Sequence, residues 1–309
     1  MLHKLKFYCI AVSLFLMSEA CQTTKNKKEY KSFNIVDDVK QNHFFSHHPR
    51  RVVCLVPSVT ELLYAIDADS QIVAVTEHCN YPERAKNHPK KLVVYPNVST
   101  EQVLALKPDV ILASTEIISI KLIEQFKPHQ IPVFFVNYQT LNDIPRTVRV
   151  LGKLLGKEIK SNQIADSVEK VIQEYAQYSP LHRPKMWVAI GTQPLYTAGK
   201  NSFINDMVYI SGGQNIAESI TYMAYPVLTR EFILSQRPEY LVVSHQQKST
   251  VQQTLLRLYP EMKSLPCLQD TSKIIGIEED LLVRPTLRSL EAVKKLRSVI
   301  LKKSLRQNN

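Results

Sequence analysis

The stretches "TEQVLALKPDVILAS" at 100–114 and "TREFILSQRPEYLVVS" at 229–244 follow one pattern. Each reads as a short amphipathic helix, a basic residue, proline, an acid, and an apolar strand that ends in serine. Proline ends the helix because it has no amide hydrogen and clashes with the preceding turn. The basic residue before it, Lys107 or Arg237, complements the carbonyl end of the helix. The motif therefore predicts the same helix-to-strand corner in two similar lobes.

Strand and helix signals alternate on both sides of this motif. Two short strands and a turn come before a buried strand from Val52 to Val56. Such alternation predicts parallel sheets covered by helices. Between 141 and 178 the strand signals stop, and apolar residues recur at mostly three to five positions, as in one long helix or two nearly continuous ones. Gly152 and Gly156 weaken the helix locally.

These signals predict an α/β protein of two lobes, each a mainly parallel sheet flanked by helices, joined by one long backbone helix. Parallel sheets bind ligands at the carboxyl ends of their strands, so two facing lobes define a cleft. The expected divisions are a signal peptide at 1–20, a tether and first strands at 21–45, an N-terminal lobe at 46–140, the connecting long helix at 141–180, and a C-terminal lobe at 181–309.

The N-terminus predicts export. Lys4 and Lys6 precede an apolar run, from Phe7 to Met17, that is short for a membrane span and has the order of a secretory signal. Cleavage after Ala20 would leave Cys21 first. Either that cysteine is lipidated, or the signal is simply removed.

Composition describes an ordinary globular protein, with 309 residues, 44% hydrophobic content and a net charge of +11. Basic residues are scattered, and the denser clusters lie in the tether and in the last helix. A solvated surface explains them, and export argues against a nucleic-acid partner.

Patterns typical of enzymes are missing from the sequence. It has no GxGxxG, GxxxxGK[ST], GxSxG or HExxH pattern and only seven glycines. No CxxC pair supports a zinc or redox motif, and "HFFSHH" at 43–48 is interpreted as a polar connection. A disulfide between Cys79 and Cys267 stays open. Ser58 and Glu61 are spaced as a capping box for a helix that begins near Pro57.

The chain resembles the helical-backbone class of substrate-binding proteins that feed ABC importers for cobalamin, haem and ferric siderophores. The cobalamin-binding members are most similar. Five motifs in the family's order carry the resemblance over almost the whole exported chain: "VDDVKQNHFFSHHPRRVVCLVPSVTELLYAID", "NVSTEQVLALKPDVIL", "PLYTAGKNSFINDMVYISGGQNIAE", "TREFILSQRPEYLVVS" and "LLVRPTLRSLEAV".

The resemblance implies a set of ligand-binding residues in the cleft, with tyrosines where the cobalamin binder has other aromatic residues. Asp280 and Arg284 form the implied polar pair, which would hold the ligand's periphery. Arg284 would also suit haem propionates. The set is Pro57, His78, Tyr95, Tyr196, Tyr225, Asp280 and Arg284.

The resemblance also implies two docking residues, Glu101 and Glu231, which match the glutamates that contact arginine pockets of a permease dimer. The alternative is that each is an acid in the first turn of a helix, where it complements the helix dipole. The family's turn glycine after "DD" is replaced by Val39 and Lys40.

The resulting hypothesis is a non-enzymatic, monomeric binding protein, periplasmic or lipid-anchored facing the periplasm or cell surface. It would deliver cobalamin or a related corrinoid to an ABC importer, with no cofactor or resident metal. Haem or a ferric siderophore is the alternative cargo. An exported enzyme and a metal-ion receptor are rivals from other classes, the latter suggested only by His78 and Asp280.

Overall fold

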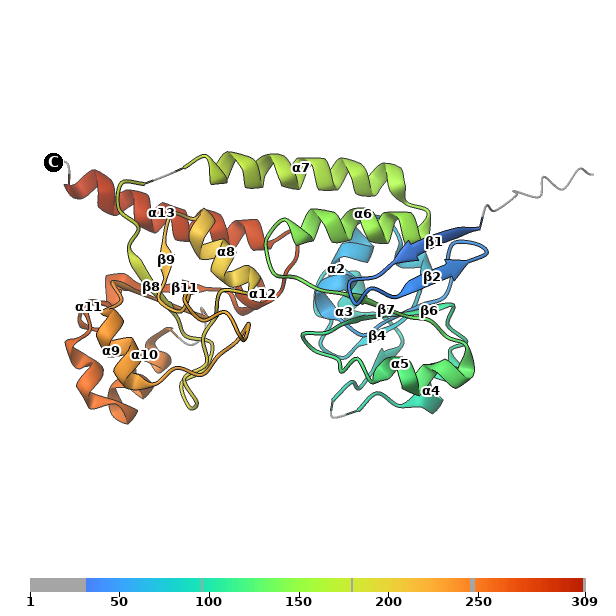
Figure 1. The fold of residues 1–309 in the computed structure, drawn as a ribbon, viewed down its shortest axis with the longest axis horizontal. Coiled ribbons are helices and arrows are strands. Elements are labelled where there is room, and N and C mark those ends of the chain that lie inside the picture. The colour runs from blue at the N-terminus through green and yellow to red at the C-terminus, as the bar shows by residue number, and fades with distance from the viewer. Residues whose placement is uncertain (1–31, 96, 179, 245–247, 308–309) are drawn as a thin grey trace, which may run out of the picture.

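The computed structural model describes residues 32–95, 97–178, 180–244 and 248–307. The predicted signal peptide and Cys21 lie outside these ranges. The described chain forms two α/β lobes beneath a layer of helices (Figure 1). It contains no helix with the length and apolar character needed to cross a membrane.

The N-terminal lobe is built on a five-stranded parallel sheet with the order β5-β4-β3-β6-β7. An antiparallel hairpin of β1 (Phe33–Val36) and β2 (Asn42–Phe45) packs beside it. The sheet strands are β3 (Val52–Cys54), β4 (Ile72–Thr76), β5 (Lys91–Leu92), β6 (Val110–Ser114) and β7 (Val133–Val136). The helices of this lobe are α2 (Pro57–Ala65), α3 (Glu83–Lys86), α4 (Thr100–Ala105) and α5 (Leu122–Phe126).

The C-terminal lobe repeats this architecture with a four-stranded parallel sheet of order β11-β10-β8-β9. Its strands are β8 (Lys185–Val188), β9 (Gln214–Asn215), β10 (Tyr240–Ser244) and β11 (Ile274–Ile277). Its helices are α8 (Phe203–Ile210), α9 (Arg230–Gln236), α10 (Lys248–Leu258), α11 (Pro266–Gln269), α12 (Glu279–Val283) and α13 (Ser289–Gln307).

The repeated motif forms the predicted corner in both lobes. Lys107 and Arg237 both adopt left-handed backbone conformations, with φ of 46° and 49°, where α4 and α9 end. The acid after each proline then binds the neighbouring strand: Asp109 accepts amide hydrogens from Arg50 and Arg51, and Glu239 accepts one from Lys185. The two corners therefore lock equivalent helices to equivalent sheets.

The segment between the lobes is not the single long helix that the sequence predicts for residues 141–180. It forms α6 (Asp143–Leu155) and α7 (Glu158–Ala176), folded back on each other as an antiparallel hairpin. Gly156 ends α6 in the left-handed region, at φ 68°, a conformation that favours glycine. Only α7, of 19 residues, passes from one lobe to the other (Figure 1).

Gly152 allows the two helices of the hairpin to approach closely. A Cβ at this position would collide with the side chain of Ser161. We therefore expect Gly152→Ala to lower the free energy of unfolding by about 1 to 3 kcal/mol through overpacking. Urea denaturation measures this effect, with the exposed neighbour Lys153→Ala as the control. Equal stability of the two variants would contradict the close approach.

One apolar core links the lobes beneath α7. Buried residues of the same cluster come from α2 (Leu63), α7 (Val168 and Ile172), α8 (Met207) and α13 (Leu296). Two further clusters fill the other faces of the two sheets. Because the shared core spans both lobes, they are connected by packed side chains as well as by the chain itself.

Candidate functional site

A cavity of about 330 Å³ lies between the two lobes. Three of its lining segments follow the strands β3, β6 and β8, at the carboxyl ends where parallel sheets bind ligands, and a fourth lies at the end of α12, the helix that follows β11. The lining residues are Pro57, Ser58, Glu116 and Ile117 from the N-terminal lobe, and Ile190, Tyr225, Val283, Arg284 and Pro285 from the C-terminal lobe.

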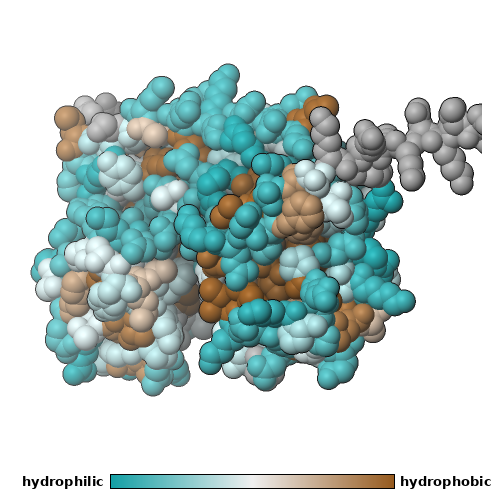
Figure 2. All heavy atoms as spheres, turned by 45° about the vertical axis from the view of Figure 1, so that its right-hand side comes forward, coloured by the Kyte–Doolittle hydropathy of each residue, from teal (hydrophilic) through white to brown (hydrophobic). Residues whose placement is uncertain are grey.

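Exposed apolar residues lie close in sequence to cavity-lining residues of both lobes, namely to Ile117 and to Tyr225. Ile117 and Ile120 are exposed on the N-terminal side, and Tyr222, Met223 and Val227 are exposed on the C-terminal side. Figure 2 shows apolar residues gathered beside the gap between the lobes. Exposed apolar residues that cluster around a cavity mark a binding surface more often than single exposed ones do. The whole surface can accept a ligand larger than the cavity itself.

Glu116 is the acid of this cavity. It follows β6, lines the cavity and is exposed to solvent there. Desolvation raises the pKa of Glu116 to about 7, and the nearby negative charge of Asp143 adds to this shift, while the backbone amide of Tyr138 opposes it. Glu116 therefore exchanges its proton near neutral pH.

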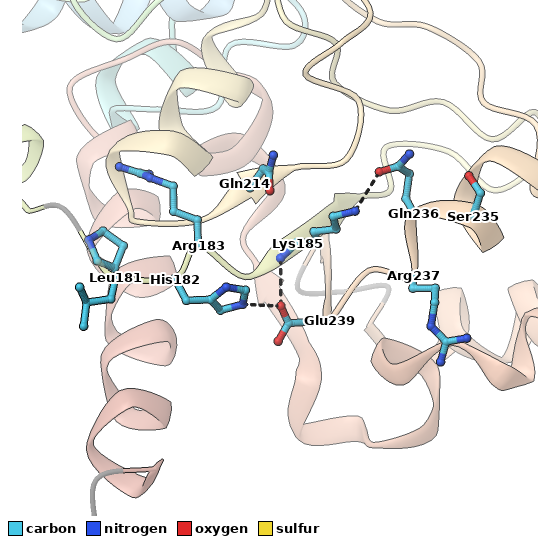
Figure 3. Close-up of a pocket in the computed structure, with 10 residues that line it drawn as sticks. Leu181, His182, Arg183, Lys185, Gln214, Ser235, Gln236, Arg237 and Glu239 are labelled. Carbon is cyan, nitrogen blue, oxygen red and sulfur yellow. Dashed lines mark hydrogen bonds and ion pairs between the residues drawn. The ribbon is translucent and has the colours of Figure 1, made fainter.

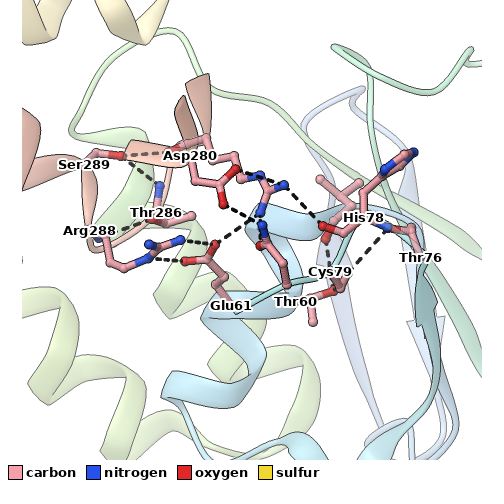
Figure 4. Close-up of polar contacts among 12 residues, drawn as sticks. Thr60, Glu61, Thr76, His78, Cys79, Asp280, Thr286, Arg288 and Ser289 are labelled. Carbon is pink, nitrogen blue, oxygen red and sulfur yellow. Dashed lines mark hydrogen bonds and ion pairs between the residues drawn. The ribbon is translucent and has the colours of Figure 1, made fainter. Parts of the chain in front are cut away.

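A network of polar side chains joins the lobes beside the cavity (Figure 4). We call it the interlobe network; its members are Glu61 and Asn80 of the N-terminal lobe and Asp280, Arg284 and Arg288 of the C-terminal lobe. Arg288 donates to both oxygens of Glu61, at 2.8 and 2.9 Å. Its guanidinium also lies over the ring of Tyr81. Only 6% of Glu61 is exposed, so this bidentate pair is held away from water.

Arg284 lines the cavity but directs its donors into the interlobe network. It donates to Asn80 Oδ1 at 2.6 Å and to the His78 carbonyl at 3.2 Å. It also pairs with Asp280 at 3.0 Å and lies 3.8 Å from Glu61. Asp280 in turn accepts a hydrogen bond from the Asn80 amide at 2.8 Å. Asp280 therefore balances the charge of Arg284, and Glu61, which Arg288 binds more closely, adds a second negative charge nearby.

The predicted capping box at Ser58 and Glu61 is wrong. Helix α2 begins at Pro57, with Val56 as its N-cap residue, and that side chain cannot accept a hydrogen bond. Glu61 instead binds Arg288, which is 227 residues away in the sequence. Tertiary pairing has therefore replaced the local role that the spacing indicated.

The structure places the predicted ligand residues in three different settings. Pro57, Tyr225 and Arg284 line the cavity, and Asp280 lies behind it in the interlobe network. The other three are outside the set that lines the cavity. Tyr95 is 81% exposed, Tyr196 packs against Gly191 beside the cavity, and the His78 imidazole points away from the interlobe network (Figure 4).

Glu101 and Glu231 occupy equivalent places on the two lobes. Each is an exposed acid in the first turn of its helix, α4 or α9. Ser99 and Thr229 cap these helices by accepting amide hydrogens. Glu101 accepts a hydrogen bond from the Ser99 hydroxyl, whereas Glu231 accepts one from Arg230 at 2.7 Å. These contacts help to keep the pKa of both carboxyl groups below the ordinary value, so both are ionised at neutral pH.

A second hollow, of about 630 Å³, lies at the other end of the C-terminal sheet (Figure 3). Its cationic side chains do not converge on a common point. His182 pairs with Glu239, Lys185 donates to the Gln236 side chain, and Arg237 points away from both. This arrangement offers no focused anion site.

The cysteines and metal-type ligands add no reactive centre to the described part of the chain. Cys54, Cys79 and Cys267 are all buried and free, so the open question of a bond between Cys79 and Cys267 is answered negatively in this structure. Among the described residues no three His, Cys, Asp or Glu side chains cluster as metal ligands.

Sequence reasoning did not identify several residues of the site and its support. Cavity-lining residues among them are Glu116, Ile117, Ile190, Val283 and Pro285, and Asn80 and Arg288 belong to the interlobe network. The predicted strand of the first motif contained a signal for Glu116 and Ile117, because both follow its carboxyl end. Nothing in the local sequence marks Asn80 and Arg288, whose partners lie in the opposite lobe.

Two α/β lobes joined by a shared core, with a cavity between them at the carboxyl ends of their strands, define a bilobal binding protein. Residues 52–305 match the family model described as periplasmic binding protein. The chain belongs to the periplasmic binding protein family, whose members are exported substrate-binding components of transporters rather than enzymes.

Relatives support this assignment. An uncharacterized ABC transporter substrate-binding lipoprotein of Bacillus subtilis, YvrC, is 31% identical over 228 residues, covering 71% of each chain. A vitamin B12-binding protein of Pectobacterium atrosepticum is 29% identical over 201 residues, which is 63% of this chain and 71% of that protein.

Two solved structures from Vibrio cholerae share the fold. The periplasmic vitamin B12 binding protein BtuF is 21% identical, with a TM-score of 0.70, covering 81% of this chain and 96% of that one. The periplasmic haem binding protein HutB is 20% identical, with a TM-score of 0.69, covering 81% of this chain and 99% of that one.

Proposed function

We propose that this protein captures cobalamin or a related corrinoid outside the cytoplasm and delivers it to the permease of an ABC importer. The observation that carries the proposal is the cavity between the lobes. Its walls are mostly apolar, and exposed apolar residues such as Ile117 and Tyr222 continue them onto the surface. Such walls suit a large ligand with an apolar ring face.

Relatives support the choice of cargo. Several that match this chain, at 25 to 29% identity, are vitamin B12-binding proteins. Haem is the second candidate, because structural neighbours include haem-binding proteins. The engaged guanidinium of Arg284 favours the corrinoid, because its donors already bind protein groups and are not free for a propionate.

The route to the permease follows from the two equivalent glutamates. Glu101 and Glu231 present ionised carboxylates from the same helix position in each lobe. A permease dimer with an arginine pocket on each subunit could bind both through charge-assisted hydrogen bonds. We propose that the protein acts as a monomer and that lipidation of Cys21 anchors it to the membrane. Mass spectrometry of the protein from membranes tests the anchor.

Titration of the chain lacking residues 1–21 with cyanocobalamin tests the cargo. We expect stoichiometric binding, followed by calorimetry. Tyr225 lines the cavity, and loss of about 80 Å² of apolar contact in Tyr225→Ala should cost about 2 kcal/mol, or roughly thirtyfold in Kd. Tyr209→Ala, at the outer end of α8, is the matched control. Absence of cyanocobalamin binding, or equal affinity in the two variants, would refute the assignment of cargo to this cavity.

A further inference from the structure

Two charged residues occur among those that line the cavity, and they are not equivalent. Arg284 is enclosed by the interlobe network, where its guanidinium binds Asn80, the His78 carbonyl and Asp280. Among the described residues Glu116 forms no ion pair; its neighbours include the Tyr138 amide, which stabilises the carboxylate, and Asp143, which carries the same charge.

From this arrangement we infer that Glu116 is a specificity-determining residue that makes the cleft select ligands with an uncharged or hydrogen-bond-donating periphery and reject ligands with an anionic one. The inference rests on the proposed function, which gives the size and shape of the ligand. It adds the charge that the ligand's periphery must have. Carboxamide edges can donate to Glu116, whereas ligand carboxylates would be repelled by it. The ligand class is therefore a large apolar ring with neutral or donor groups at its edge.

Coulomb repulsion and desolvation both disfavour an anionic ligand in this cavity. In a partly enclosed cavity, two like charges interact more strongly than in water, because the effective dielectric constant is lower. An anionic group placed beside ionised Glu116 would lose hydration and gain no free cation in exchange. A neutral donor loses less hydration and gains a charge-assisted hydrogen bond.

The groups around Glu116 fix how this selection changes with pH. Tyr225 interacts electrostatically with Glu116 across the cavity, and Tyr138 and Asp143 face it from the N-terminal lobe. Burial and the charge of Glu116 both raise the pKa of Tyr225, so this tyrosine stays neutral. Arg284 lines the same cavity with its charge balanced. Glu116 is thus the group that changes charge between pH 6 and pH 8, and rejection of anions should be stronger at pH 8.

A pair of dyes tests the charge preference without assuming the natural cargo. N-phenyl-1-naphthylamine is neutral, and 8-anilinonaphthalene-1-sulfonate is its sulfonated analogue. For the chain lacking residues 1–21 at pH 8, we expect the neutral dye to bind about tenfold more tightly. Glu116→Gln should reduce the ratio of the two dissociation constants severalfold. Glu116→Lys should bind the sulfonated dye more tightly than the neutral one.

The control is Glu124→Lys on α5, an exposed acid of the same lobe whose replacement changes the total charge equally. Circular dichroism checks that the Glu116 variants are folded, and the nearly isosteric glutamine keeps the test valid if the lysine variant is not. Equal binding of both dyes by the native chain, binding of neither, or a preference unchanged in both Glu116 variants would overturn the inference.

A matched pair of macrocycles connects the charge preference to the cargo. Haemin carries two propionates, and haemin dimethyl ester has the same ring without those charges. The inference predicts tighter binding of the ester by the native chain and a smaller difference in Glu116→Gln. Tighter haemin binding at pH 8 would overturn it. If cyanocobalamin fails to bind while the dye preference holds, the proposed cargo is wrong and the charge selection stands.

Discussion

A double variant, Glu101→Ala with Glu231→Ala, is expected to abolish uptake of the ligand while leaving its affinity unchanged. Both carboxylates lie on exposed first turns, in α4 and α9, and neither lines the cavity between the lobes. Removing them therefore removes contacts with the permease and not contacts with the cargo. Uptake of labelled cobalamin by cells that depend on this protein measures the loss, and calorimetry on the purified chain measures affinity.

The two glutamates are not expected to contribute equally. Glu231 is paired with Arg230, which also lies 3.5 Å from Glu261, so a permease arginine must compete with Arg230. The Glu101 carboxylate instead accepts hydrogen bonds from uncharged groups, its own backbone amide and the Ser99 hydroxyl. Glu101→Ala alone should therefore reduce uptake more than Glu231→Ala alone.

The control for this experiment removes two other exposed acids, with Glu124→Ala on α5 and Glu174→Ala on α7. It produces the same change in net charge away from the two motif positions. Normal uptake by the Glu101 and Glu231 double variant, or equal loss in the control, would show that docking does not depend on these residues.

The repeated motif was predictable because its physical cause is local. A proline after a basic residue ends a helix whatever surrounds it, and the structure shows the same left-handed residue at Lys107 and Arg237. The alternation of strand and helix was sufficient to place the cleft at the carboxyl ends of the strands. Glu116 could have been found by the same rule, because it follows the predicted strand of the first motif.

The errors come from residues whose partners are distant in sequence. The spacing of Glu61 is that of a capping residue. Only the folded chain shows that its carboxylate binds the Arg288 guanidinium. Arg284 was expected to face the ligand, and its position on the cavity wall agrees with that, but its donors bind the N-terminal lobe. Residue type and motif position do not encode such pairing.

The expected helix between the lobes shows a different limit. Periodicity over 141–178 predicts helix, and the two glycines were treated only as weak points. In the structure Gly156 reverses the chain and Gly152 lets the two helices approach. Because helix periodicity is the same before and after a reversal, it cannot distinguish one straight helix from a hairpin.

Glu61→Ala is expected to give the largest loss of stability of any single change in the interlobe network. It would leave Arg288 and Arg284 largely buried with one carboxylate partner fewer. Removing one partner of a buried pair costs about 3 kcal/mol, because the remaining charge is uncompensated. Urea denaturation measures this loss, and Glu83→Ala on the exposed α3 is the control.

A further variant tests separately whether the interlobe network restricts relative motion of the lobes and whether it contributes to stability. Glu61→Met with Arg288→Met removes both charges and leaves apolar groups in their place, so we expect it to be more stable than Glu61→Ala alone. It still lacks the bidentate contact that fixes α2 of one lobe against the turn before α13 of the other. The double variant should therefore be stable and yet have a wider distribution of distances between the lobes.

Spin labels at Lys127→Cys and Lys263→Cys, one in each lobe, measure that distribution by double electron-electron resonance. In the chain lacking residues 1–21, the three remaining native cysteines should not react, since all three are buried and desolvation raises the pKa of Cys54 and of Cys267 to about 12. Pro57 and Ser58, which line one side of the cavity, begin the helix that carries Glu61. Arg284 and Pro285, which line the other side, precede Arg288 in the chain. Loss of the Glu61–Arg288 pair therefore removes a contact that holds these two walls of the cavity together. Ligand dissociation should then be faster in the double variant. A distance distribution as narrow as that of the native chain would mean that the core beneath α7 fixes the lobes without the interlobe network.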